Sequence, residues 1–409
     1  MQKRPPSSHR PSRVMGVLWA TFFFQGMALG CWLPALTNTF GALGISEWVP
    51  LAFMIPTICA LFSPLIAGAL ADQRLAAERI FLWFSLGASI MIAAAFATLD
   101  LGWHPAWFMA LLACHAILSG PTWAMLTTIA LNGLDDPSRK FSLARLGGTV
   151  GWIAGGLLVS LVLHADSSPV AGYASGCTRL IVVGLAFFLP HTPPMGVIRD
   201  WRSRFGLDAL RLLKQRDHLV FFVVTGLFSV PIAAFYMYGP EYLSFLGDQH
   251  PTGTMTVGQV LEIICMLCLG SLLARYSVKT MLMWALGLSA LRFAMSAQAG
   301  VNDQIWWHIG GLALHGVCYT LYFVTSQIFI DRRVEPGLRS QAQGLLMVVS
   351  AGFGSLIGAW LCGWMREHMV DANGVGWIQF WLLLSGMILA CALIFAIFYR
   401  GLGKPTQEA

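Results

Sequence analysis

A single carboxylate lies deep inside an apolar segment. Residues 257–267 read VGQVLEIICML, and Glu262 is the only charged side chain among them. A charge at the centre of a membrane helix costs at least ~2.5–3.5 kcal/mol, so such a residue indicates a function. Gln259 comes three residues earlier and shares its helical face. The pair favours a cavity that binds a polar solute and takes up a proton; the alternative is an interhelical hydrogen bond from a permanently protonated acid.

Three residues of different chemistry share one face of another predicted helix. Arg145, Thr149 and Trp152 are spaced i, i+4 and i+7 within the stretch FSLARLGGTVGW. They offer a cation, a hydroxyl group and a flat aromatic ring, and the glycines between them allow a neighbouring helix to approach closely. Arg145 could equally be a plain cation of an inner loop.

A histidine and two tyrosines are aligned in a third apolar run. His315, Tyr319 and Tyr322 lie on one helical face. Aromatic rings can stack on flat substrates, and histidine titrates near neutral pH. Aromatic stripes are more often packing than binding, but the histidine favours a binding role.

The composition defines the kind of chain that must position these groups. Hydrophobic residues make up 57% and charged residues 11% of the 409 residues, and the mean hydropathy is +0.68. So few polar side chains cannot cover soluble domains, and the runs are too long for barrel strands. The sequence therefore predicts an all-α polytopic membrane protein with twelve spans. These cover residues 14–37, 49–70, 80–98, 105–130, 147–164, 170–189, 218–243, 256–275, 279–298, 304–330, 340–363 and 375–399.

The basic residues predict an orientation. Of the 25 Lys and Arg residues, 22 lie in the two tails and in alternate loops, which places both termini in the cytoplasm. The same loops explain the net charge of +6, so no nucleic-acid partner is indicated. Residues 1–13, basic and rich in Pro and Ser, are expected to form a disordered cytoplasmic tail, and residues 401–409 a second cytoplasmic tail.

The sequence offers little for redox, metal or enzyme chemistry. The nine cysteines are mostly isolated within apolar runs, and the pair Cys265 and Cys268 is interpreted as helix packing. We therefore expect no structural disulfide, metal or cofactor. No nucleophile–base pair, metal cluster or phosphate-binding loop is evident, so an enzyme is the least supported class.

The longest break between apolar runs divides the chain into two six-helix halves, 14–189 and 218–400. Residues 190–217 form the linker, and its second half has a basic amphipathic pattern suited to a membrane surface. This layout resembles the major facilitator superfamily, in which the substrate site lies between the halves near the membrane midplane.

The loop after the second run, GALADQR at 68–74, resembles a signature of that superfamily. A glycine would allow close helix packing, and an aspartate would cap or pair at a cytoplasmic gate. Gly68, Asp72 and Arg74 are therefore predicted to form the gate.

Five motifs, spread over most of the chain, resemble the nucleoside:H+ symporter family of this superfamily. They are Arg145-x-x-Gly148-Thr149-x-Gly151, LPHTPP at 189–194, Gln259-x-x-Glu262, His315-Gly316-x-Cys318-Tyr319, and Glu335-x-x-x-Arg339-x-x-Ala342-Gln343-Gly344. The resemblance implies proton-driven import of nucleosides by alternating access, performed by a monomer in the bacterial cytoplasmic (inner) membrane.

By matching position, the resemblance also implies the binding residues. The predicted substrate-binding set is Arg145, Thr149, Trp152, Tyr236, Gln259, Glu262, His315 and Tyr319. Aromatic faces would hold the base, and polar groups would hydrogen-bond the ribose or the base edge. Glu262, helped by His315, would carry the coupled proton.

Three positions depart from the family pattern. Thr320, which cannot titrate, stands where family members commonly have an aspartate, and Ala233 and Tyr236 stand where a family member has polar amides. Arg179, within the sixth run, has no predicted role. Two alternatives stay open: a facilitator or symporter of another polar solute such as a sugar, and a membrane sensor that binds nucleoside without transporting it.

Overall fold

The described residues of the computed structural model form helices, turns and loops, without β-strand. They are residues 11–195, 207–248, 254–302, 304–371 and 373–401. Eleven of the helical spans are long and apolar enough to cross a membrane, and a shorter apolar helix, Val170–Ala186, is the twelfth. The predicted all-α polytopic fold is confirmed. Most of the predicted tail 1–13, and residues 402–409 of the other, lie outside the described residues.

The N-terminal half follows the predicted spans with two breaks. Its elements are α1 (Pro11–Trp32), α2 (Leu36–Ala42), a 3-10 turn (Ser46–Trp48), α3 (Val49–Cys59), α4 (Ser63–Gln73), α5 (Ala77–Asp100), α6 (Pro105–Gly133), α7 (Pro137–Leu157) with a π-helical end (Leu158–Val162), and α8 (Val170–Ala186). The first predicted span breaks at Pro34, which lacks a backbone N–H and restricts the residue before it. Residues 11–13 belong to α1 rather than to the predicted tail, since proline is favourable in a first helical turn.

Helix α7 begins well before the predicted span 147–164. The Asp136 side chain caps it by accepting a hydrogen bond from the backbone N–H of Arg139 at 3.3 Å, and Pro137 opens its first turn. Arg145 therefore lies inside the helix and is only 8% exposed. The interpretation of Arg145 as an inner-loop cation is wrong.

The C-terminal half contains long spans, two of which have π-helical interruptions. Its elements are α10 (Arg216–Phe245), α12 (Val257–Arg275), α13 (Val278–Asn302), α14 (Ile305–Tyr319) continuing through a π segment (Thr320–Val324) into α15 (Thr325–Arg333), a 3-10 turn (Pro336–Leu338), α16 (Arg339–Met347) continuing through a π segment (Val348–Gly354) into α17 (Ser355–Met369), and α18 (Trp377–Phe398). Such π-helical turns are frequent at functional sites.

The second described part of the predicted linker, from residue 207, packs on the C-terminal half. Leu207–Lys214 forms a 3-10 helix that buries Ala209 and Leu212, and Arg211 Nη2 lies 3.3 Å from Glu335 Oε2. Its charged side chains face outward, as the amphipathic pattern predicts.

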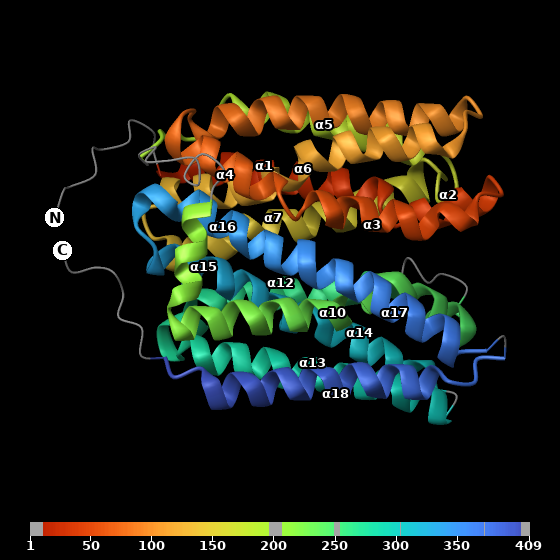
Figure 1. Cartoon of the computed structure of the whole chain (residues 1–409). Helices are drawn as coiled ribbons and strands as arrows, with labels where there is room; N and C mark the ends of the chain where they lie inside the picture. Colours follow the sequence, from red (N-terminus) through yellow and green to blue (C-terminus); the bar gives the residue numbers. More distant parts are fainter. Residues whose placement is uncertain (1–10, 196–206, 249–253, 303, 372, 402–409) are drawn as a thin grey trace.

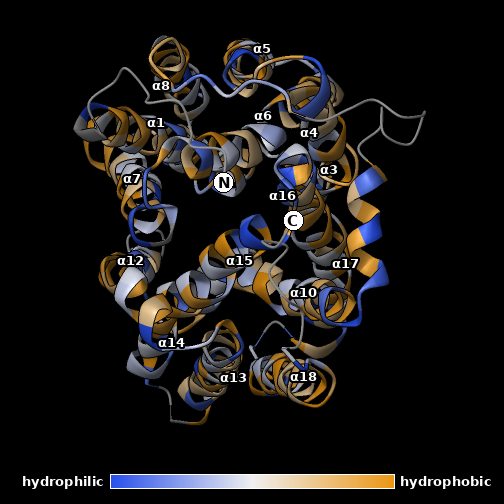
Figure 2. Ribbon diagram, turned by 90° about the vertical axis from the view of Figure 1, so that its left-hand side faces the viewer, coloured by the Kyte–Doolittle hydropathy of each residue, from blue (hydrophilic) through white to orange (hydrophobic). Residues whose placement is uncertain are grey.

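Figure 1 shows the two halves as two groups of roughly parallel helices, α1–α8 above and α10–α18 below. Helix α1 begins and α18 ends at the left of this view, which we call the terminal end; the opposite side is the far end. Seen along the helices, α7 lies beside α12 and α4 beside α16, and both pairs make contacts between the halves (Figure 2).

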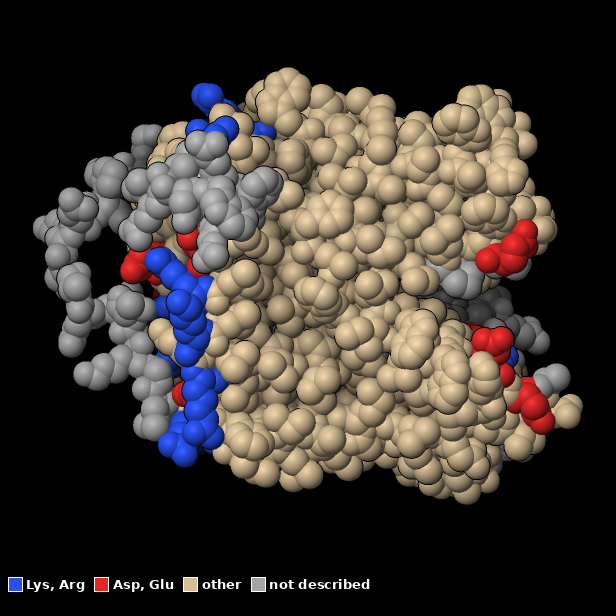
Figure 3. Space-filling model, in the orientation of Figure 1, with Lys and Arg blue, Asp and Glu red and all other residues tan. Residues whose placement is uncertain are grey.

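Charged side chains gather at the two ends of the bundle. On the face shown in Figure 3, Lys and Arg form a band at the terminal end, acidic residues appear at both ends, and the wide belt between them carries no visible charge. This belt is what a helix bundle exposes to lipid hydrocarbon.

Candidate functional site

A hydrogen bond between the halves lies at the centre of the molecule. Thr149 Oγ1 on α7 donates to Glu262 Oε1 on α12 at 2.6 Å, and both side chains are buried. Gly316 lets α14 approach the backbone of Glu262, because a Cβ at this position would lie 2.5 Å from the Glu262 nitrogen. The only deep carboxylate predicted from the sequence is thus held by a residue of the opposite half.

Arg145 makes a second contact between the halves. Its Nη2 donates to the Tyr319 hydroxyl oxygen on α14 at 3.2 Å. The guanidinium carbon also lies 4.5 Å from the ring centroid of Trp123 and 5.7 Å from that of Phe22, which is cation–π geometry. Arg145 is close enough to interact electrostatically with the Glu262 carboxyl group. It therefore contributes positive charge to the carboxylate from across the interface.

His315 is enclosed by aromatic residues of α10. The Tyr236 hydroxyl lies 3.2 Å from His315 Nε2, and the Phe235 ring stacks on the imidazole with centroids 3.9 Å apart and an interplanar angle of 16°. His315 is buried, whereas 40% of Tyr236 is exposed. The histidine thus supports a tyrosine that faces open space.

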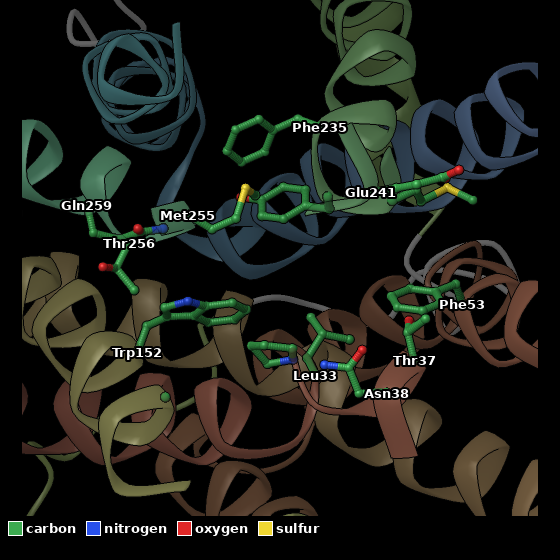
Figure 4. Close-up of a pocket in the computed structure, with 14 residues that line it drawn as sticks. Leu33, Thr37, Asn38, Phe53, Trp152, Phe235, Glu241, Met255, Thr256 and Gln259 are labelled. Carbon is green, nitrogen blue, oxygen red and sulfur yellow. The ribbon is translucent and has the colours of Figure 1, made fainter. Parts of the chain in front are cut away.

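That space is a cavity of about 370 Å³ between the halves, within the size range of small-molecule sites. Figure 4 shows Trp152 on one side of it, with Gln259 and Phe235 on the other. The lining residues are Leu33, Pro34, Thr37, Asn38, Phe53, Trp152, Gly156, Phe235, Tyr236, Met237, Glu241, Met255, Thr256 and Gln259. Along α7 and α12, these residues lie on the far-end side of the Thr149–Glu262 hydrogen bond.

The predicted binding residues fall into two groups. Trp152, Tyr236 and Gln259 line the cavity. The Gln259 amide, oriented to satisfy its neighbours, donates to the backbone oxygens of Thr256 and Met255 at 3.0 Å and leaves its oxygen as an acceptor. The other five lie behind it. Arg145 with Tyr319, and Thr149 with Glu262, form the two hydrogen bonds between the halves, and His315 pairs with the hydroxyl of Tyr236.

Tyr322 does not join this site. It is fully buried, its hydroxyl lies 3.1 Å from Thr225 Oγ1, and its ring packs on Phe228 at 4.7 Å. The shared helical face with His315 does not bring Tyr322 into the site, because the π-helical turn that begins at Thr320 changes the direction of the side chains that follow it.

Several cavity residues were not predicted. Thr37 and Asn38 come from α2, whose position depends on the break at Pro34, and Phe53 comes from α3. Glu241 lines the cavity and accepts from Arg366 Nε at 2.8 Å. A polar residue inside a predicted span, Thr37, was the available signal.

The predicted gate motif lies at the terminal end, where the halves touch. Asp72 Oδ2 accepts a hydrogen bond from the backbone N–H of Gln341 at 3.1 Å. A Cβ at Gly68 would lie 2.9 Å from the backbone oxygen of Ser340, so the glycine permits this approach. Arg74 is exposed at the end of α4 and does not take part in the contact.

A second contact closes the same end. Arg339 Nη1 donates to Asn132 Oδ1 at 2.7 Å, and its Nε lies 3.5 Å from Asp331 Oδ1. The cavity is thus closed toward the terminal end and lies on the far-end side of the central hydrogen bond.

Two six-helix halves around a central cavity, which is closed toward the terminal end, define a transporter of the major facilitator superfamily fold. The structure of the proton:xylose symporter XylE of this superfamily superposes with a TM-score of 0.73 at 13% identity, covering 98% of this chain and 99% of XylE. At this identity the similarity concerns the fold alone.

The chain belongs to the nucleoside H+ symporter family, whose profile matches residues 15–403. It is 34% identical to YegT of Escherichia coli (strain K12) over 401 residues, covering 94% of this chain and 91% of YegT. The crystal structure of a variant of the nucleoside transporter NupG superposes with a TM-score of 0.75 at 23% identity, covering 95% of this chain and 100% of that one. The members of the family are transporters and not enzymes.

Proposed function

We propose that this protein imports nucleosides across the bacterial cytoplasmic membrane by proton symport, through alternating access. The observation that carries the proposal is the hydrogen bond from Thr149 to Glu262, which ties the deep carboxylate predicted from the sequence to the opposite half beside the cavity. Membership of the nucleoside H+ symporter family supports the substrate and the coupling ion. The band of basic residues at the terminal end supports cytoplasmic termini.

The cavity offers the groups that a nucleoside requires. Trp152 from one half and Tyr236 from the other provide aromatic faces for a base. Gln259 and Asn38 provide amide groups for the ribose hydroxyls or the base edge. Because these residues come from both halves, a substrate bound between them contacts both halves at once. Its binding can therefore influence how the halves are arranged.

The role of the coupled proton follows from the position of the groups that stabilise the ionised Glu262 carboxylate. Both Thr149 and Arg145 belong to the N-terminal half. If the halves moved apart with the carboxylate ionised, a buried charge would lose its partners, which costs several kcal/mol. A proton on Glu262 removes the charge and with it this cost. Leaving the state described here with nucleoside bound therefore requires protonated Glu262. Once the proton is released to the cytoplasm, the ionised carboxylate favours return of the empty protein to this state, where Thr149 and Arg145 are its partners. Each proton moved inward contributes about 2.3 kcal/mol per 100 mV.

Uptake of radiolabelled nucleoside into proteoliposomes, with and without a pH gradient, tests this. Glu262→Gln imitates the protonated acid, so we expect it to lose gradient-driven accumulation while it retains exchange of labelled for unlabelled nucleoside. Glu367→Gln, which changes an exposed acid of α17, is the matched control and should behave as the native chain. Accumulation that survives Glu262→Gln contradicts the proton role.

The same assay separates the alternatives. Thr320, in place of the family aspartate, favours a facilitator as the second candidate: it would equilibrate nucleoside without accumulating it. A sugar transporter would take up labelled sugar in competition with unlabelled sugar but not with nucleoside. A sensor would bind nucleoside, measured by calorimetry, and show no flux.

A further inference from the structure

A buried cation lies behind the wall of the cavity. Arg292 on α13 is 2% exposed, and its Nε and Nη2 find no hydrogen-bond partner within the described residues. In the same part of the chain, Arg292 makes none of the ion pairs with carboxylates. Its guanidinium carbon lies 4.2 Å from the ring centroid of Phe293 and 4.8 Å from that of Phe235. Guanidinium groups remain charged in proteins, so a permanent positive charge is held here by aromatic faces.

The charge of Arg292 lies close to His315, because both side chains contact Phe235. The imidazole stacks on this ring at a centroid distance of 3.9 Å, and the guanidinium carbon is 4.8 Å from its centroid. A protonated imidazole would therefore place a second positive charge close to the Arg292 guanidinium, in contact with the same ring. Little water is present there to screen the repulsion between the two charges.

The hydrogen bonds of His315 give an independent reason against a charge. Its Nε2 pairs with Tyr236, whereas its Nδ1 is buried without a partner among the described residues. A protonated imidazole carries a hydrogen on both nitrogens, so one charged N–H would be left without an acceptor. The neutral ring can carry its hydrogen on Nε2 and donate it to Tyr236, which leaves only a lone pair unpartnered at Nδ1.

The remaining groups around His315 do not offset the repulsion. Tyr319, from the same helix, lies with its ring 6.1 Å away, and its hydroxyl accepts from the second cation, Arg145. Cys318 adds only a thiol. Glu262 packs its backbone against Gly316, but its carboxyl oxygen is bound by Thr149 in the other half.

We propose that Arg292 keeps His315 uncharged, so that His315 acts as a fixed hydrogen-bond partner that positions Tyr236 in the cavity and leaves Glu262 as the only proton-binding group of the transport cycle. The part concerning the cycle rests on the proposed function. The proposal narrows the sequence-based prediction, in which His315 assisted Glu262 in proton coupling.

The protonation of His315 can be read without transport. Carbon-13 spectra of the purified protein with labelled histidine report the charge of each imidazole, and the His315→Gln spectrum identifies the signal. We expect the His315 signal to remain that of a neutral ring between about pH 5 and 8 in the native chain, and to begin to protonate at a higher pH in Arg292→Gln than in the native chain, although burial still disfavours the charged ring. Arg292→Lys keeps the charge and should keep the ring neutral. A native His315 that titrates in this range overturns the proposal, even if Arg292→Gln fails to fold.

Transport then tests the role of His315. Gln can keep a hydrogen bond to Tyr236, so His315→Gln should accumulate nucleoside with the same proton-to-nucleoside ratio as the native chain, measured from the reversal potential in proteoliposomes. Arg292→Gln should add a step to the pH profile of uptake, and the double variant with His315→Gln should lack it. Loss of coupling in His315→Gln overturns the inference while Glu262 keeps its role. Failure of the native chain to couple overturns the proposed function and, with it, the part of the inference that concerns the cycle, but not the protonation measured by the spectra.

Discussion

Asp72, in the last turn of α4, accepts a hydrogen bond from the backbone N–H of Gln341 at 3.1 Å, in the first turn of α16. The carboxylate of one half therefore caps the start of a helix in the other, where free N–H groups and the positive end of the helix dipole favour an acidic partner. In the proposed transport cycle, this contact at the terminal end would break and re-form as the halves move.

Asp72→Ala should weaken this closure. It leaves a buried backbone N–H unpartnered, a cost of about 1–3 kcal/mol to the state described here. Hydrogen–deuterium exchange of a peptide covering 339–347 should become faster by roughly 5- to 150-fold. Asp72→Asn keeps an acceptor oxygen and should fall between the native chain and Asp72→Ala. Unchanged exchange in Asp72→Ala contradicts the capping role.

Thr149→Val should reduce transport strongly. It keeps the shape of the side chain but removes the donor to Glu262, and hydrogen bonds to charged groups contribute about 1.5–3 kcal/mol. The specific uptake rate, kcat/KM, should fall by roughly 10- to 100-fold. Thr149→Ser retains the hydroxyl group and is expected to stay within about threefold of the native rate. Equal rates for the Val and Ser variants would show that the hydrogen bond does not contribute.

Gly316→Ala should disturb the packing of α14 on α12. The added Cβ would lie 2.5 Å from the Glu262 nitrogen, so one helix has to move. Overpacking of this kind costs about 1–3 kcal/mol, which should lower the thermal unfolding temperature in detergent and abolish uptake. The matched control is Gly287→Ala in α13, where a Cβ meets no atom within 4 Å. It should preserve both properties, because alanine is favoured over glycine in a helix.

The sequence predicted the spans, the two halves and Glu262 because each depends on a local pattern. Apolar run length identifies a membrane helix wherever it lies, and a deep carboxylate is visible within eleven residues. The partner of Glu262 was not visible in the same way, since Thr149 is 113 residues away and meets it only through the packing of α7 on α12. No function was predicted for Arg292 for the same reason: its proposed role depends on Phe235 and His315, which lie on two other helices.

Local geometry also explains the predictions that failed. The start of α7 was placed too late because the stretch around Arg145 is less apolar than a typical span, whereas the cap at Asp136 and the proline after it decide where the helix begins. Asn38 was not considered because it lies one residue beyond the predicted span 14–37, which was treated as one straight helix. The break at Pro34 turns α2 so that Thr37 and Asn38 reach the cavity.

Trp152→Ala should separate a nucleoside from a sugar as the substrate. The indole lines the cavity opposite Gln259 and Phe235, and base–aromatic stacking contributes about 1–3 kcal/mol per base (Figure 4). Loss of the ring should therefore raise the KM for a nucleoside by roughly 5- to 150-fold, while Trp152→Phe, which keeps an aromatic face, should raise it much less. Competition by free ribose against labelled nucleoside is the internal comparison, since ribose has no base to stack and its inhibition constant should be nearly the same in both variants and the native chain. If the KM for the nucleoside is unchanged in Trp152→Ala, the base does not bind against Trp152.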